Sequence, residues 1–129
     1  MSRRILQIVV AAAGIVPVGA GLLGVLLGPG MILAGGHVSV SQDSHWRYLS
    51  GLLLGIGVAF WSTIPRIEAA GRTFRLLTGI VVVGGLARLW ALLTFGRPDA
   101  AMLFGLAMEL LVTPALAVWQ YQLAQGGAK

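Results

Sequence analysis

Two residues of opposite charge, Arg88 and Glu109, stand inside otherwise apolar stretches of this sequence. The planar guanidinium of arginine stays charged and presents a fork of N–H donors that matches the two oxygens of a carboxylate. Such a pair can hold two helices together, bind the polar group of a ligand, or place a carboxylate for proton transfer. The elements that carry the two residues decide which of these is feasible.

Further polar residues stand near this pair or in a second apolar stretch. Thr113 follows Glu109 by four positions, a spacing that puts two side chains on one face of a helix. Arg47 and Ser50 lie at the beginning of another apolar stretch. We therefore expect ligand binding from five residues, with no catalytic role assigned: Arg47, Arg88, Glu109, Ser50 and Thr113.

Several other kinds of site are excluded or not expected. The chain has no cysteine, which rules out disulfides, thiolate metal sites, haem attachment and cysteine nucleophiles. His37, Asp43 and His45 lack the regular spacing of helical or finger ligands, so we expect no metal site. No Ser/His/Asp arrangement, phosphate-binding glycine loop or dinucleotide motif stands in a suitable context, and no cofactor is assigned.

The composition indicates a membrane protein. Of 129 residues, 57% are hydrophobic and 10% are charged, whereas soluble domains carry about 25% charged residues. The net charge is +5, but the basic residues separate apolar runs instead of clustering on one solvated face. We therefore expect the lipid bilayer, and not nucleic acid, as the partner.

Four stretches have the ~20 apolar residues that a helix needs to cross a bilayer. They cover residues 5–28, 46–64, 73–95 and 101–123, and none shows the alternation of a barrel strand. The fold class predicted is all-α, a four-helix bundle in the membrane, with residues 1–129 as a single domain. The first stretch exceeds the usual 7–15-residue core of a signal peptide, so we expect it to be retained.

The distribution of Lys and Arg predicts the orientation. Arg47 and Arg97 fall on one side of the membrane, and the opposite side carries Arg3, Arg4, Arg66, Arg72, Arg75 and Lys129. Because cytoplasmic loops are enriched in Lys and Arg, both termini should lie in the cytoplasm. This asymmetry also argues against a protein that inserts in both orientations.

The same topology places Arg88 and Glu109 at one depth. At 1.5 Å per residue, Arg88 lies ~10 Å and Glu109 ~12 Å from the outer ends of their helices. Because these helices are neighbours joined by residues 96–100, we predict an Arg88–Glu109 ion pair, either as a structural lock or as part of a ligand site. Arg47 has two alternatives, extension to the lipid headgroups or an inward turn toward Glu109.

Small residues predict how the helices pack. Glycine and alanine at every fourth position let two helix backbones approach in a bilayer, and two helices carry such a stripe: Ala20, Gly24 and Gly28, then Gly51, Gly55 and Ala59. We expect these stripes to pack within the chain, with homodimerisation as the alternative. Pro17 predicts a bend in the first helix, and Pro114 predicts a loosened backbone beside Glu109.

Four segments together resemble a known family: SHWRYLSG at 44–51, GGLARL at 84–89, GRP at 96–98 and ELLVTP at 109–114. The chain resembles the DUF4345 family of bacterial four-helix membrane proteins over residues 44–122, and weakly in the first helix. The resemblance implies a four-span fold in a bacterial inner membrane and no particular activity. It also singles out Arg47, Arg88 and Glu109.

Three classes of function remain open. The hypothesis we favour is a small membrane protein that binds a lipid-like or other hydrophobic ligand, or serves as an accessory subunit of a membrane-protein partner. The second is a membrane-embedded enzyme with Glu109 as general acid or base. The third is a small transporter with Glu109 as proton carrier, which the fixed orientation and the absence of an internal repeat disfavour.

Overall fold

The protein is helical throughout the part of the chain that the structure describes. This structure is a computed structural model, and it describes residues 2–31 and 36–127; Lys129, counted above for the orientation, lies outside these ranges. Within them there is no strand, and four helical segments are long and apolar enough to cross a membrane: Arg3–Gly30, Val40–Arg66, Gly71–Phe95 and Ala100–Gly126. The predicted all-α class with four spans is therefore confirmed.

The chain divides into two compact units. The first contains Met1–Gln7 and Pro65–Lys129, and the second contains Ile8–Ile64. Helix α1 (Arg3–Leu27) begins in the first unit and continues into the second. Each unit is described by itself below, and the packing of all four helices as one bundle stays a prediction.

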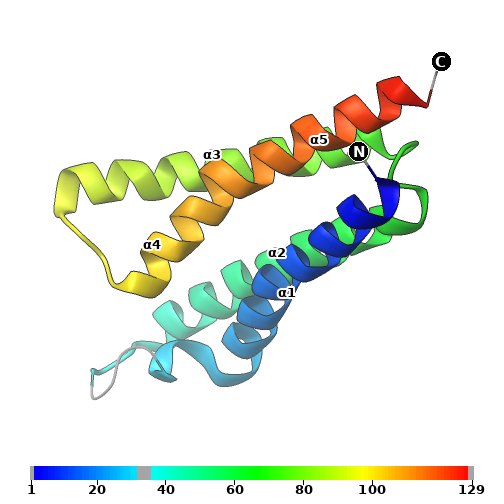
Figure 1. Cartoon of the computed structure of the whole chain (residues 1–129). Coiled ribbons are helices and arrows are strands. Elements are labelled where there is room, and N and C mark those ends of the chain that lie inside the picture. The colour runs from blue at the N-terminus through cyan, green and yellow to red at the C-terminus, as the bar shows by residue number, and fades with distance from the viewer. Residues whose placement is uncertain (1, 32–35, 128–129) are drawn as a thin grey trace. The chain divides into compact units, whose positions relative to one another are not determined.

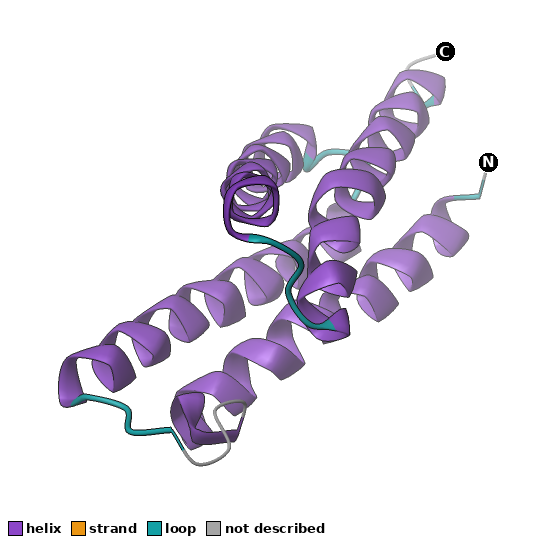
Figure 2. Ribbon diagram, turned by 90° about the vertical axis from the view of Figure 1, so that its left-hand side faces the viewer, coloured by secondary structure: helices purple, strands orange, loops and turns teal. Residues whose placement is uncertain are grey.

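In the second unit α1 lies beside α2 (Val40–Thr63), as Figures 1 and 2 show. A Cβ atom built at Gly21 would stand 2.5 Å from the backbone nitrogen of Leu54, so only glycine fits this contact. Gly57 is similarly close to Val18. The two helices thus pack through small residues, although a Cβ at Gly55, part of the predicted stripe, would meet nothing within 4 Å.

Helix α2 begins earlier than the apolar pattern predicts, at Val40 instead of residue 46. Ser39 Oγ accepts a hydrogen bond from the Gln42 N–H at 3.2 Å, and Gln42 Oε1 accepts one from the Ser39 N–H at 3.0 Å. This reciprocal capping satisfies donors that the first turn otherwise leaves free. Polar residues therefore start the helix, which hydropathy alone does not reveal.

In the first unit α3 (Gly71–Phe95) packs against the fourth helical segment. That segment consists of α4 (Ala100–Ala107), the π-helical turn η3 (Met108–Val112) and α5 (Thr113–Gly126). In Figure 1 the segment changes direction between α4 and α5. Pro114 explains the π turn, because proline has no N–H and its ring clashes with the carbonyl four residues before it.

The connection between α2 and α3 binds the end of α5 and the beginning of α1 through hydrogen bonds to its backbone. It begins with the short η2 (Ile64–Arg66). Gln120 is fully buried and donates from Nε2 to the Ile67 carbonyl at 2.8 Å, while Arg3 Nη2 donates to the Pro65 carbonyl at 2.9 Å. The start of α1 and the end of α5 are thereby fixed to the same connection.

Candidate functional site

Arg88 of α3 and Glu109 of η3 form an ion pair in the first unit. Arg88 Nε donates to Glu109 Oε2 at 3.0 Å, and Nη2 donates to Oε1 at 3.1 Å. The side chains are 34% and 18% exposed, respectively. This is the two-pronged geometry in which a guanidinium and a carboxylate fit best, and the structure brings together the two residues that the depth argument paired.

The remaining arm of the guanidinium contacts a thioether. Arg88 Nη1 donates to Met102 Sδ at 2.8 Å, and thioether sulfur is a weak acceptor compared with oxygen. Met102 was not among the predicted site residues. Its position seven residues before Glu109, two helical turns on the same face, was the available signal.

Glycines provide the space that the pair occupies. A Cβ atom built at Gly85 would stand 2.9 Å from Glu109 Cβ and 2.8 Å from Leu110 Cδ2, so α3 and η3 approach closely there. A Cβ at Gly105 would lie 3.8 Å from Arg88 Cζ, which places the guanidinium directly over this glycine. Where these two glycines face the Arg88–Glu109 pair, the neighbouring surface is therefore helix backbone without a side chain.

The π-helical turn changes the hydrogen bonding around Glu109. The Thr113 N–H bonds to the Met108 carbonyl, and the Thr113 hydroxyl donates to the same oxygen at 2.7 Å. Pro114 offers no N–H to the turn before it, so one carbonyl there lacks its helical donor. Isolated π turns of this kind are frequent at functional sites. Thr113 thus supports the backbone next to Glu109, and its hydroxyl oxygen can still accept a hydrogen bond.

Arg47 and Ser50 belong to the second unit, where Arg47 has polar partners of its own. Arg47 pairs with Asp43 through Nε–Oδ2 at 2.8 Å and donates from Nη1 to the Val25 carbonyl at 2.5 Å. It therefore neutralises Asp43 and caps the end of α1, a favourable place for a cation. The spacing of four residues between Asp43 and Arg47 could have indicated this pair. Ser50 is buried against Gly24.

The described ranges 2–31 and 36–127 contain no cluster of metal-ligand residues. Nowhere in them do three side chains of His, Cys, Asp or Glu gather as metal ligands would. Glu109 and Asp43 are both engaged by arginines. The chemistry available at the Arg88–Glu109 pair is therefore hydrogen bonding to a polar group and proton exchange with the carboxylate.

By the length and composition of its four helices, this is a multi-pass membrane protein with an ion pair between two of its spans. The chain belongs to the family described as a domain of unknown function, DUF4345, whose model matches residues 5–120. The match confirms the family resemblance and extends it through the first helix. No curated protein and no solved structure matches the chain.

Proposed function

We propose that the protein binds a lipid-like or other hydrophobic ligand whose polar group is held by Arg88, acting alone or as an accessory subunit of a membrane complex. The observation that supports this most is the hydrogen bond from Arg88 Nη1 to the Met102 sulfur. A guanidinium arm that ends on a weak acceptor gains energy when an oxygen atom replaces the sulfur, because a hydrogen bond from a charged donor to oxygen is stronger.

The cost of the pair also supports a ligand role. Each charge costs ~2.5–3.5 kcal/mol at the centre of a bilayer on insertion scales. Apolar residues of similar volume often join two elements as well as a buried ion pair does. A lock between α3 and η3 alone therefore does not require Arg88 and Glu109, whereas recognition of a polar group within an apolar surface does.

The geometry suggests the chemistry of the ligand. Glu109 already neutralises Arg88, and Asp43 neutralises Arg47, so no surplus charge remains at either pair to require an anion. An oxygen acceptor on an apolar body, such as an ester or ketone carbonyl, fits Arg88 Nη1. A hydroxyl on the same ligand could donate to Glu109 or Thr113. The ligand class that we propose is thus an amphiphile with an oxygen-bearing head.

Native mass spectrometry of the gently solubilised protein tests this proposal. We expect the wild type to retain a non-protein mass and Arg88→Ala to lose it. Arg97→Ala is the matched control, because Arg97 lies in the connection between α3 and α4 and should leave the mass in place. Wild-type protein without any bound mass would argue against ligand binding.

A second candidate function is catalysis on such an amphiphile with Glu109 as general acid or base. It is favoured by the π turn at Met108–Val112, which loosens the helix at the one carboxylate of the site. The same spectra distinguish the two candidates. An enzyme should retain one mass in the wild type and a different mass, the unconverted substrate, in Glu109→Gln, whereas a binding protein should retain the same molecule or none.

A further inference from the structure

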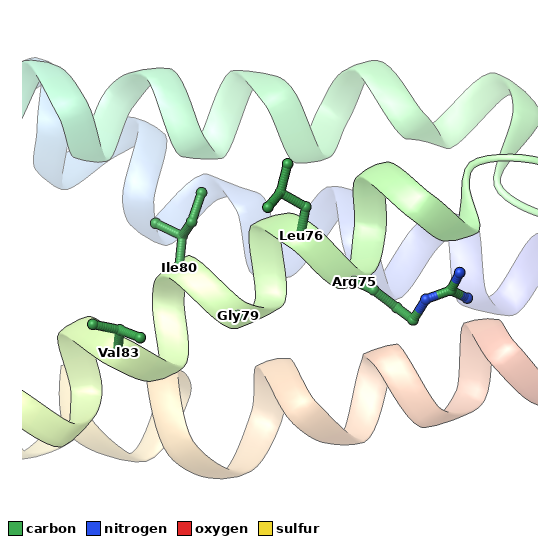
Figure 3. Close-up of a pocket in the computed structure, with 5 residues that line it drawn as sticks. All are labelled: Arg75, Leu76, Gly79, Ile80 and Val83. Atoms are coloured by element: carbon green, nitrogen blue, oxygen red, sulfur yellow. The ribbon is translucent and has the colours of Figure 1, made fainter.

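A shallow open groove of about 470 Å³ follows one face of α3, and Arg88 is not among the residues that line it. Five residues line it, as Figure 3 shows: Arg75, Leu76, Gly79, Ile80 and Val83. Leu76 and Val83 are each 67% exposed. A Cβ atom at Gly79 would meet nothing within 4 Å, so no side chain of the first unit covers the helix backbone at the floor of the groove.

One end of the groove carries an uncompensated positive charge. The Arg75 side chain extends toward the beginning of α3 and away from Val83 (Figure 3). Its guanidinium lies over Gly71, where a built Cβ would stand 3.2 Å from Nη1. Among the described residues, the ion pairs are Arg47–Asp43 and Arg88–Glu109, so Arg75 has no carboxylate partner there.

More basic residues accompany Arg75 in the same unit. Arg72 is exposed in the first turn of α3, and Arg66 ends η2 just before it. Arg3 joins this end through its hydrogen bond to the Pro65 carbonyl. Glu68 is the acidic residue of the connection. This end of the unit therefore carries a net positive charge, and it is the end that the topology argument assigns to the cytoplasmic leaflet.

We propose that the groove is a binding site for one anionic phospholipid, with its phosphate on Arg75 and an acyl chain over Gly79. The distance along α3 from Arg75 to Val83 is about 12 Å at 1.5 Å per residue, close to the ~15 Å depth of one hydrocarbon leaflet. The lining is apolar except at the arginine end, which matches a molecule with an apolar chain and an anionic head. Guanidinium groups bind phosphate oxygens in the same forked geometry as carboxylates.

This lipid site is separate from the Arg88 site. Arg75 and Arg88 are about 20 Å apart along the same helix at the α-helical rise, and the two sites share no lining residue. Lipid binding at Arg75 therefore neither requires nor excludes the ligand proposed for Arg88.

The test is a lipid titration of the full chain in detergent micelles, with bound lipids counted by native mass spectrometry. The probes are palmitoyl-oleoyl phosphatidylglycerol and the zwitterionic phosphatidylcholine with the same chains. We expect the wild type to prefer phosphatidylglycerol. Arg75→Gln should weaken that lipid by about fivefold, as expected for one basic residue at a membrane surface. It should weaken phosphatidylcholine less, because the choline of that headgroup already neutralises the phosphate.

Gly79→Leu tests the groove itself, because a leucine there would occupy the space of the acyl chain. It should weaken both lipids. Gly84→Leu is the matched control, since Gly84 also has nothing within 4 Å of a built Cβ but lies outside the groove. Arg97→Gln should bind phosphatidylglycerol as the wild type does. The melting temperature of each variant in detergent checks that it is folded.

Three results would overturn the proposal. The first is equal affinity of the wild type for the two lipids, and the second is unchanged phosphatidylglycerol binding in Gly79→Leu. The third is a dimer of the wild type that Gly79→Leu dissociates, because the groove would then be the contact surface of a second copy of the chain.

Discussion

At the scale of single residues, the neighbours of Arg88 determine what a charge inside an apolar helix can do. Two of its nitrogens are held by Glu109, and the third nitrogen contacts the sulfur of Met102. The first two contacts fix the side chain in one orientation. The third leaves one strong donor without an oxygen partner, and the ligand hypothesis depends on that donor.

Glu109→Gln should destabilise the protein. The amide keeps one oxygen acceptor but no charge, so Arg88 would remain largely removed from water without its anion, at a cost of about 1–3 kcal/mol. Thermal unfolding in detergent measures this loss. The control is Glu68→Gln in the connection between α2 and α3, which should melt close to the wild type. A Glu109→Gln protein as stable as the wild type would show that the pair contributes nothing to folding.

Some residues of the site could be predicted from the sequence, and others could not. Arg88 and Glu109 were predictable because charges inside apolar spans are costly and should meet a partner at equal depth. Met102 was not selected, because a methionine in an apolar stretch looks like any other packing residue. The Asp43–Arg47 pair was also missed, although its spacing is that of a helical ion pair.

At the scale of elements, helix contacts depend on individual glycines and not on stripes as a whole. Gly21 lies close to Leu54, and Gly57 lies close to Val18. Of the predicted stripes, Gly24 lies close to Ser50, whereas a Cβ at Gly55 would meet nothing within 4 Å. The spacing of small residues predicts that two helices approach, but it does not fix their rotation about their own axes. The beginning of α2 was misplaced for a similar reason, because side-chain capping by Ser39 and Gln42 starts the helix before its apolar part.

Gly85→Ala should separate α3 from η3. The added Cβ would stand 2.9 Å from Glu109 Cβ, so a helix must shift, and such overpacking typically costs about 1–3 kcal/mol. The neighbouring Gly84→Ala meets no atom within 4 Å and should be neutral or more stable by up to about 1 kcal/mol, since alanine favours helix. Unfolding of both variants in detergent gives the comparison, and equal stability of the two would contradict the close approach at Gly85.

For the molecule as a whole, composition and the placement of charged residues predict the class of fold and the number of spans. They do not predict how individual helices pack. Four spans, their all-α class and the family are all recognisable in the sequence, because a bilayer demands long apolar helices. The π turn at Met108–Val112 was not predictable in detail, since Pro114 signals a disturbed helix without specifying its form.

The cytoplasmic location of both termini is a further prediction, and the natural absence of cysteine makes it easy to test. Single cysteines at His37 and Glu68 should lie on opposite sides of the membrane. A membrane-impermeant maleimide added to intact cells should label His37→Cys and should label Glu68→Cys only after the membrane is opened. The reverse pattern would show that the charge asymmetry does not set the orientation.

We propose that Arg88 holds a ligand and does not serve only to join two helices. Native mass spectrometry of the wild type, Arg88→Ala and the double variant Arg88→Ala/Glu109→Ala tests it most directly. Removing both charges relieves the unpaired carboxylate, so the double variant should recover stability relative to Arg88→Ala. We expect the double variant still to lack the bound mass that the wild type retains. A double variant that recovers both the stability and the bound mass would contradict this proposal. Binding of the ligand would then depend on a folded protein and not on Arg88.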